Sequence, residues 1–166
     1  MYSKALTNMT RRPQTASKAL MTTRKATMST STKPKYAPWQ QSRILLTGCQ
    51  GQIGVPLVHA LCNEVGAENV VASDLSEQRF DFPCEYQQLD VTDEDGYREI
   101  VEETGSNYIV HLAGILSALG EKKPDLAVDV NVLGVINALR AAKDFDCRIF
   151  VPSSIAAFGG DHFQKD

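Results

Sequence analysis

Three glycines, Gly48, Gly51 and Gly54, recur at every third position directly after the short apolar run at 43–47. If this run is a strand and a helix begins near Gln52, the turn gathers backbone N–H groups and the positive end of a helix dipole, which together attract an anion. Glycine permits the tight turn, the close approach of a pyrophosphate and the packing of helix on strand. The spacing predicts a phosphate-binding loop; the alternative is a glycine-rich turn that serves packing alone.

An acidic residue, Asp74, stands at the end of the next apolar run, at 70–73. A carboxylate at the end of a second strand accepts hydrogen bonds from an adenosine ribose and repels a 2′-phosphate, so it favours NAD over NADP. Its alternative role is a helix cap or a turn. Arg79 could in principle pair with a phosphate, although it lies some distance beyond the turn. Loop, strand and acid together predict dinucleotide binding, with NAD as the cofactor.

Two further pairs of residues follow apolar runs. Asp90 and Val91 come after a third run, and Leu112 and Ala113 end a fourth. Ligands of open parallel sheets lie at the carboxyl ends of the strands, so both pairs are candidates to contact the cofactor. The carboxylate of Asp90 can accept a bond from an adenine amino group, and small residues at the second place let a cofactor lie close to the backbone.

Short apolar runs alternate with longer helix-period stretches, which is typical of a parallel sheet with covering helices. A helix is expected after the glycine loop, a second is capped by the stretch at 92–95, and a third runs from about 124 to 142. That third helix carries a long apolar stripe made by Leu126, Val130, Leu133, Ile136, Asn137 and Leu139. The predicted fold is a three-layer α/β Rossmann fold, a doubly wound parallel sheet truncated after about the fifth strand. Its strands are expected at 43–47, 69–73, 85–88, 108–112 and 148–151.

The first 40 residues differ from the rest, since they hold eight of the 17 basic residues and none of the 20 acidic ones. They are also rich in Ser and Thr and lack the apolar core of a secretory signal. This composition is typical of a mitochondrial transit peptide; the alternative is a disordered basic arm that contacts nucleic acid or only solvates the terminus. We therefore expect two parts: this arm at 1–40 and a dinucleotide-binding domain at 41–166, located in mitochondria.

The four cysteines, Cys49, Cys62, Cys84 and Cys147, are widely spaced and show no pair at metal-ligand spacing. Free thiols and no metal site are expected. No apolar run approaches the roughly 20 residues that a membrane-spanning helix needs. Neither a membrane nor a nucleic acid is an expected partner of the domain.

The motifs resemble those of the extended short-chain dehydrogenases, the NAD-dependent epimerase/dehydratase family. The shared residues are Thr-Gly-x-x-Gly-x-x-Gly at 47–54, Asp-Val at 90–91, His-Leu-Ala at 111–113, and Asn131 on the long helix. Within the family, the segment Ile-Leu-Ser-Ala-Leu-Gly-Glu at 115–121 is similar to the L-threonine 3-dehydrogenase branch. This resemblance implies NAD-dependent oxidation of L-threonine to 2-amino-3-oxobutyrate.

The resemblance also implies roles for single residues. Ser117 would face the substrate, and Ser154 would be the catalytic serine that hydrogen-bonds the reacting hydroxyl, with Ser153 as the neighbour that could be confused with it. The alternative for both serines is satisfaction of backbone groups at a strand end. Asn131 is expected to serve helix packing or a structural water rather than catalysis. The cofactor-binding set is Gly48, Cys49, Gln50, Gly51, Gln52, Ile53 and Gly54 at the pyrophosphate, Asp74 at the ribose, Asp90 and Val91 at the adenine, and Leu112 and Ala113 alongside.

One departure from the family concerns its general base, the tyrosine of a Tyr-x-x-x-Lys pair in which the lysine charge favours the phenolate. None of the five tyrosines is followed by a lysine four positions later. We therefore expect the chain to carry the cofactor half, to be inactive alone, and to act on L-threonine only when completed by the missing half. A nucleotide-sugar epimerase or dehydratase and a noncatalytic NAD-binding module are the alternatives. An open sheet edge also predicts self-association to a homo-oligomer.

Overall fold

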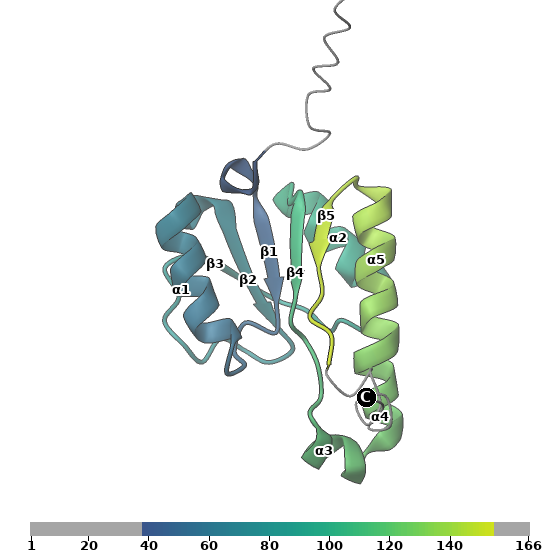
Figure 1. The fold of residues 1–166 in the computed structure, drawn as a ribbon. Coiled ribbons are helices and arrows are strands. Elements are labelled where there is room, and N and C mark those ends of the chain that lie inside the picture. The colour runs from purple at the N-terminus through teal and green to yellow at the C-terminus, as the bar shows by residue number, and fades with distance from the viewer. Residues whose placement is uncertain (1–37, 155–166) are drawn as a thin grey trace, which may run out of the picture. The chain divides into compact units, whose positions relative to one another are not determined.

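The computed structural model of the chain describes residues 38–154. Most of the basic arm predicted at 1–40 therefore lies outside the described residues. The described part contains a five-stranded, wholly parallel sheet with strand order β3-β2-β1-β4-β5 (Figure 1). The strands are β1 (Ile44–Thr47), β2 (Val70–Asp74), β3 (Glu85–Gln88), β4 (Tyr108–His111) and β5 (Arg148–Phe150). Each predicted strand is thus present, with its ends shifted by no more than one residue.

Helices cover both faces of this sheet. They are α1 (Gly54–Val65), α2 (Glu94–Thr104), α3 (Ser117–Lys122), α4 (Pro124–Val128) and α5 (Gly134–Asp144), with 3-10 turns η1 (Trp39–Gln41) and η2 (Ala67–Asn69) and the π-helical segment η3 (Asp129–Leu133). Sequence analysis did not predict α3. Figure 1 shows α1 on one side of the sheet and α2 and α5 on the other.

The three layers follow from alternation along the buried strands, because successive side chains of a strand point to opposite faces. Ile44 and Leu46 pack with α1 in one core, whereas Leu45 packs in the other core with residues of α2 and α5. Both faces are therefore apolar and covered, so β1 is a continuous run of buried residues. The predicted Rossmann fold is confirmed.

The strand order reverses at the centre of the sheet. From β1 the chain moves outward through β2 to β3, and it then crosses to β4 on the opposite side of β1. At such a switch point the connections leave in opposite directions, so a crevice opens at the carboxyl ends of the two strands. Here those ends are Thr47 and His111, which are paired in register.

The predicted helix at 124–142 is present as a continuous path through α4, η3 and α5, but its predicted stripe is only partly buried. Asn137 is 1% exposed, whereas Leu126, Leu133, Ile136 and Leu139 are exposed. The residues that pack against the sheet are the small ones, Gly134, Ala138, Ala141 and Ala142, with Asn137. Leu133, Ile136 and Leu139 remain exposed because the close contact of helix and sheet leaves room only for small side chains.

Candidate active site

The glycine loop joins β1 to α1 and lies against the end of β4. Gly48 has φ +73°, and a Cβ built on it would lie 2.6 Å from the backbone nitrogen of Ala113. A Cβ on Gly54, the first residue of α1, would overlap the carbonyl oxygen of Gly48. Only glycine fits at these two positions, so the N-terminus of α1 lies directly on the loop. The positive end of the α1 dipole therefore faces the end of β1, as an anion site requires.

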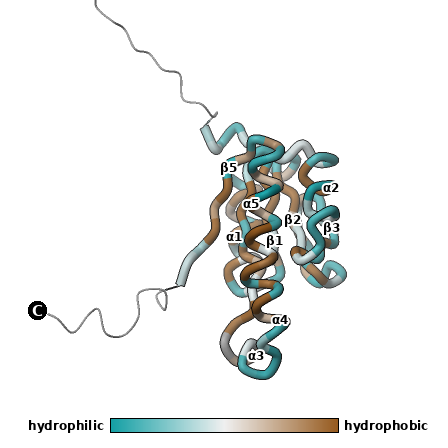
Figure 2. The backbone as a smooth tube through the Cα atoms, turned by 90° about the vertical axis from the view of Figure 1, so that its right-hand side faces the viewer, coloured by the Kyte–Doolittle hydropathy of each residue, from teal (hydrophilic) through white to brown (hydrophobic). Residues whose placement is uncertain are grey.

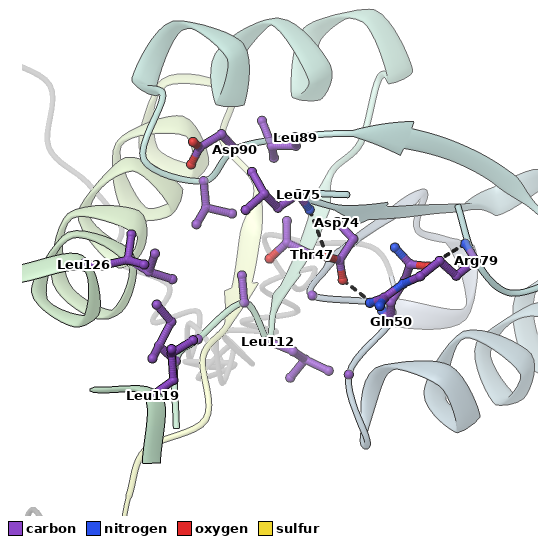
Figure 3. A pocket seen from close by; sticks show the side chains of 17 residues that line it. Thr47, Gln50, Asp74, Leu75, Arg79, Leu89, Asp90, Leu112, Leu119 and Leu126 are labelled. Atoms are coloured by element: carbon purple, nitrogen blue, oxygen red, sulfur yellow. Dashed lines mark hydrogen bonds between the residues drawn. The ribbon is translucent and has the colours of Figure 1, made fainter. Parts of the chain in front are cut away.

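A cavity of about 380 Å³ opens at the carboxyl ends of β1, β2 and β4 (Figure 3). This volume is within the range of small-molecule sites. The predicted cofactor residues that line it are Gly48, Gln50, Gly51, Asp74, Asp90, Val91, Leu112 and Ala113. The glycine loop, Asp74, the pair at 90–91 and the end of β4 are thus brought to one cavity.

Several lining residues were not predicted as site residues. The apolar ones come from every segment around the cavity, and the charged one is Arg79, which sequence analysis had placed too far from the turn. The full set of additions is Thr47, Leu75, Arg79, Leu89, Gly114, Ile115, Leu119, Leu126 and Val130. Ile115 and Leu119 belong to the segment that carries the resemblance to the threonine branch.

Other predicted residues do not line the cavity. Cys49 is fully buried in the core beneath α1, and burial, the main cause, raises the pKa of its thiol to about 12. Gln52 and Ile53 are exposed on the outer side of the loop, and Gly54 contributes by close packing. None of these four residues is among those that line the cavity.

The two acids at the cavity are held by backbone groups. The carboxylate of Asp74 accepts bonds from the backbone N–H of Gln50, at 3.0 Å, and of Leu75, at 2.9 Å. Asp90 accepts from the backbone and the hydroxyl of Thr92, at 2.9 and 2.7 Å. Asp74 thus ties the end of β2 to the glycine loop, and Asp90 closes a turn.

Two asparagines on the long helix hold the loops around the cavity. The side chain of Asn131 accepts a bond from the backbone N–H of Ile115 at 2.7 Å and donates one to its carbonyl at 3.0 Å. Asn131 lies in the π-helical segment, a departure from α-helix that often occurs at functional sites. The buried Asn137 donates to the carbonyls of Val91 and Thr92. Asn131 is thus bonded to a loop backbone, which differs from the helix packing or structural water expected for it.

A buried polar cluster, formed by Thr47, Tyr97 and His111, lies under the ends of β1 and β4. Nδ1 of His111 is 3.0 Å from the hydroxyl of Thr47 and 3.1 Å from that of Tyr97. Burial lowers the pKa of His111 to about 4, so the ring is neutral at physiological pH. Since Thr47 precedes Gly48 and His111 precedes Leu112, this cluster fixes both strand ends that meet at the cavity.

The two predicted substrate residues lie on the segments that follow β4 and β5. Ser117 is the first residue of α3. Ser154 is exposed beyond the carboxyl end of β5 and is not among the residues that line the cavity. Because β5 is the parallel neighbour of β4, Ser154 follows a strand that ends at the same edge of the sheet as the cavity. All four cysteines are free, and the described residues include no cluster of ligands for a metal ion. In the same part of the chain, no helix is long and apolar enough to cross a membrane.

Comparison with known proteins identifies relatives of this fold and site. An uncharacterized epimerase/dehydratase of Staphylococcus aureus (strain USA300) is 44% identical over 121 residues, which are 70% of this chain and 37% of that protein. The solved L-threonine dehydrogenase of Clostridium difficile is 43% identical with a TM-score of 0.66, and the match covers 70% of this chain and 38% of that one. The UDP-glucose 4-epimerase of Thermus thermophilus, solved in complex with NAD, is 26% identical with a TM-score of 0.57, and the match covers 63% of this chain and 34% of that one. The chain thus spans little more than a third of the length of these relatives.

The family model that matches is that of the NAD dependent epimerase/dehydratase family, over residues 44–166. This match includes the glycine loop, Asp74 and every other residue that lines the cavity. NAD, the cofactor predicted from loop and acid, is the cofactor named in the description of the family. The chain belongs to the NAD-dependent epimerase/dehydratase family.

Proposed function

We propose that the chain binds NAD in the cavity and forms the cofactor-binding part of an NAD-dependent L-threonine 3-dehydrogenase. The observation that carries the proposal is the meeting of the glycine loop, the N-terminus of α1 and Asp74 at one cavity. The loop and helix terminus suit a pyrophosphate, and the carboxylate suits the ribose hydroxyls. When bound, NAD accepts the hydride that leaves the substrate.

The apolar side chains of the cavity suit the two ends of this cofactor. Leu75, Leu89 and Val91 lie beside Asp74 and Asp90, on the side where adenine is expected. Ile115 and Leu119 line the other side, close to the end of β4, where the reacting ring and the substrate would meet. Asn131 holds Ile115 by its backbone, so the substrate side of the cavity is anchored to the long helix.

L-Threonine is proposed as the substrate because of the 43% identity to a threonine dehydrogenase, against 26% to the UDP-glucose 4-epimerase. The segment at 115–121 supports the same choice. The product would be 2-amino-3-oxobutyrate, with Ser154 bonded to the reacting hydroxyl and Ser117 facing the substrate. The basic composition of the first 40 residues supports a mitochondrial location for this reaction.

Calorimetric titration with NAD and with ADP-ribose tests cofactor binding by the purified chain. Wild type should bind both ligands, and Asp74→Ala should bind both more weakly because the ribose hydroxyls lose their acceptor. Absence of binding to wild type, in a chain shown to be folded by circular dichroism, would refute the proposal.

A chimera tests the substrate. Residues 1–166 would be followed by the remaining part of the Clostridium difficile enzyme. NADH formation would be measured with L-threonine, and conversion of a uridine-diphosphate sugar, the competing candidate, would be followed by chromatography because epimerases and dehydratases return the hydride to the sugar. We expect the chimera to turn over L-threonine and not the uridine-diphosphate sugar. The chain without this addition should form no NADH, because it has no Tyr-x-x-x-Lys pair. Tight NAD binding with no turnover by the chimera would favour the noncatalytic module.

A further inference from the structure

The side chain of Gln50 lies between the glycine loop and the segment at 76–79 that follows β2. Gln50 is only 8% exposed, although it belongs to a loop. Its Nε2 lies 3.1 Å from the hydroxyl of Ser76, 3.1 Å from the carbonyl of Glu77 and 3.2 Å from the hydroxyl of Tyr86. Its Oε1 accepts a bond from the backbone N–H of Arg79 at 2.6 Å. One amide therefore holds the whole segment against the loop.

Gln50 is also bonded to two residues of opposite charge. Through its backbone N–H, Gln50 binds the carboxylate of Asp74, and through its side chain it binds the backbone of Arg79 (Figure 3). Asp74 and Arg79 both line the cavity, and both act on the phenol of Tyr86. Burial is the main cause that raises the pKa of Tyr86 to about 12; the charge of Asp74 adds to the rise and that of Arg79 opposes it. Asp74 and Arg79 thus both line the cavity, and each is bonded to Gln50, Asp74 through its carboxylate and Arg79 through its backbone N–H.

The carboxyl end of β2, where Asp74 lies, is the place at which the adenosine ribose of a dinucleotide is expected, so the two charges have opposite effects on a 2′-phosphate. A phosphate monoester carries a charge of about −1.5 to −2 at neutral pH, and the carboxylate of Asp74 repels it. A guanidinium pairs with phosphate through two parallel hydrogen bonds, and an arginine near this place is a known solution for NADP. Arg79 therefore offsets part of the discrimination that Asp74 imposes.

We propose that Gln50 is a positioning residue that holds Arg79 beside Asp74, and that the cavity accordingly accepts the 2′-phosphate of NADP as a second, weaker ligand class. The proposal rests on the proposed binding of NAD in the same cavity. It assigns a phosphate-binding role to Arg79 and explains why a long amide side chain is buried in the glycine loop.

The test measures dissociation constants of the full chain for ADP-ribose and for 2′-phospho-ADP-ribose, which need no turnover, and takes their ratio. Wild type should prefer ADP-ribose but bind both. Arg79→Leu should raise the preference for ADP-ribose about tenfold, the size expected for a lost hydrogen bond to a charged group. Gln50→Met should raise it similarly, and the double variant should raise it no further, because both changes remove the same contact. Asp74→Asn should lower the preference.

Gln78→Met is the matched control: Gln78 belongs to the same segment, and among the described residues its amide is bonded to the carbonyl of Phe80 and not to the glycine loop, so the preference should stay at the wild-type value. Thermal unfolding confirms that each variant is folded. If Gln50→Met weakens the binding of both ligands by the same factor, the role of Gln50 is structural only and the proposal is wrong. It is equally wrong if Arg79→Leu leaves the preference unchanged while ADP-ribose still binds. Failure of wild type to bind either ligand would overturn the proposed function and this inference together.

Discussion

His111 shows how a single buried residue couples the site to the stability of the fold. Its ring is 1% exposed, and its Nδ1 meets the hydroxyls of Thr47 and Tyr97. Among the described residues its Nε2 has no hydrogen-bond partner. Protonation would place a charge on that buried nitrogen, and this explains why burial lowers the pKa of the ring. The neutral ring is therefore part of the folded state.

The depressed pKa predicts a pH dependence of stability. The unfolded chain takes up a proton at His111 near pH 6.5, whereas the folded chain does so only near pH 4. Unfolded molecules bind more protons in this interval, so the free energy of unfolding falls by about 3 kcal/mol as the pH drops from about 6.5 to about 4. Urea unfolding of wild type at several pH values measures this loss.

His111→Gln should remove that part of the pH dependence, while the part due to carboxylates remains. His59→Gln changes an exposed histidine on α1 and should keep the wild-type slope. Identical slopes for wild type and His111→Gln would show that His111 does not titrate as its burial implies.

Gly54 gives a second prediction for a single residue. An alanine there would drive its methyl group into the carbonyl oxygen of Gly48 and the backbone of Cys49, so α1 would have to move away from the loop. Gly54→Ala should cost about 2 kcal/mol or more in the free energy of unfolding and abolish binding of ADP-ribose. Gly120→Ala is the control, because its new Cβ would meet only the Cβ of Ala127, at 3.4 Å. Wild-type affinity in Gly54→Ala would mean that the loop does not need this close packing.

At the scale of elements, α2 shows how a local signal in the sequence determines where a helix begins. Asp93 is the N-cap, and its carboxylate accepts from the backbone N–H of Asp95 and Gly96. Asp93→Ala should lower the free energy of unfolding by about 1 kcal/mol, whereas Asp93→Asn keeps an acceptor and should cost less. Chemical denaturation of both variants makes the comparison. Equal losses for the two would indicate that charge, not capping, is responsible.

The elements that could be predicted are those whose position depends on residues close together in the sequence. Buried parallel strands are continuous apolar runs, so β1 and β4 could be located from sequence to within one residue. The apolar stripe of the long helix gave no indication of which of its residues are buried, because burial depends on how closely the helix approaches the sheet. The small residues Ala138 and Ala141 make that approach possible. Periodicity shows which residues share a face, but the packing distance decides which face is buried.

The residues of the candidate site likewise fall into those that could be predicted from the sequence and those that could not. Gly48 and Asp74 were predictable because a strand, a turn and a helix determine their positions within one unit of the chain. Arg79 was not, because it reaches the cavity through a hydrogen bond to Gln50, which lies 29 positions earlier. Ile115 likewise depends on Asn131, from another element. Such contacts arise only when the loops are closed in three dimensions.

At the scale of the whole molecule, two adjoining features leave apolar groups uncovered in the part of the chain that the structure describes. Val128, Val132, Ile136 and Leu139 are between 38% and 59% exposed and follow helical spacing. Figure 2 shows hydrophobic residues recurring along this path from α4 to α5. Beside it, β5 pairs only with β4 and is an edge strand of the described sheet, with Phe150 50% exposed. Apolar helix faces and open strand edges both favour association.

We therefore expect the purified chain to self-associate, and light scattering after size-exclusion chromatography measures its mass. Val132→Glu with Leu139→Glu should shift the population toward the 18.2 kDa monomer, because burying two carboxylates in an apolar contact is costly. Leu116→Glu is the matched control, because Leu116 is 81% exposed but lies outside this face. A wild-type chain that stays monomeric over the accessible concentrations would contradict the prediction. Association that persists in the double variant but ends with Phe150→Pro would instead assign it to the strand edge, since proline removes a backbone donor.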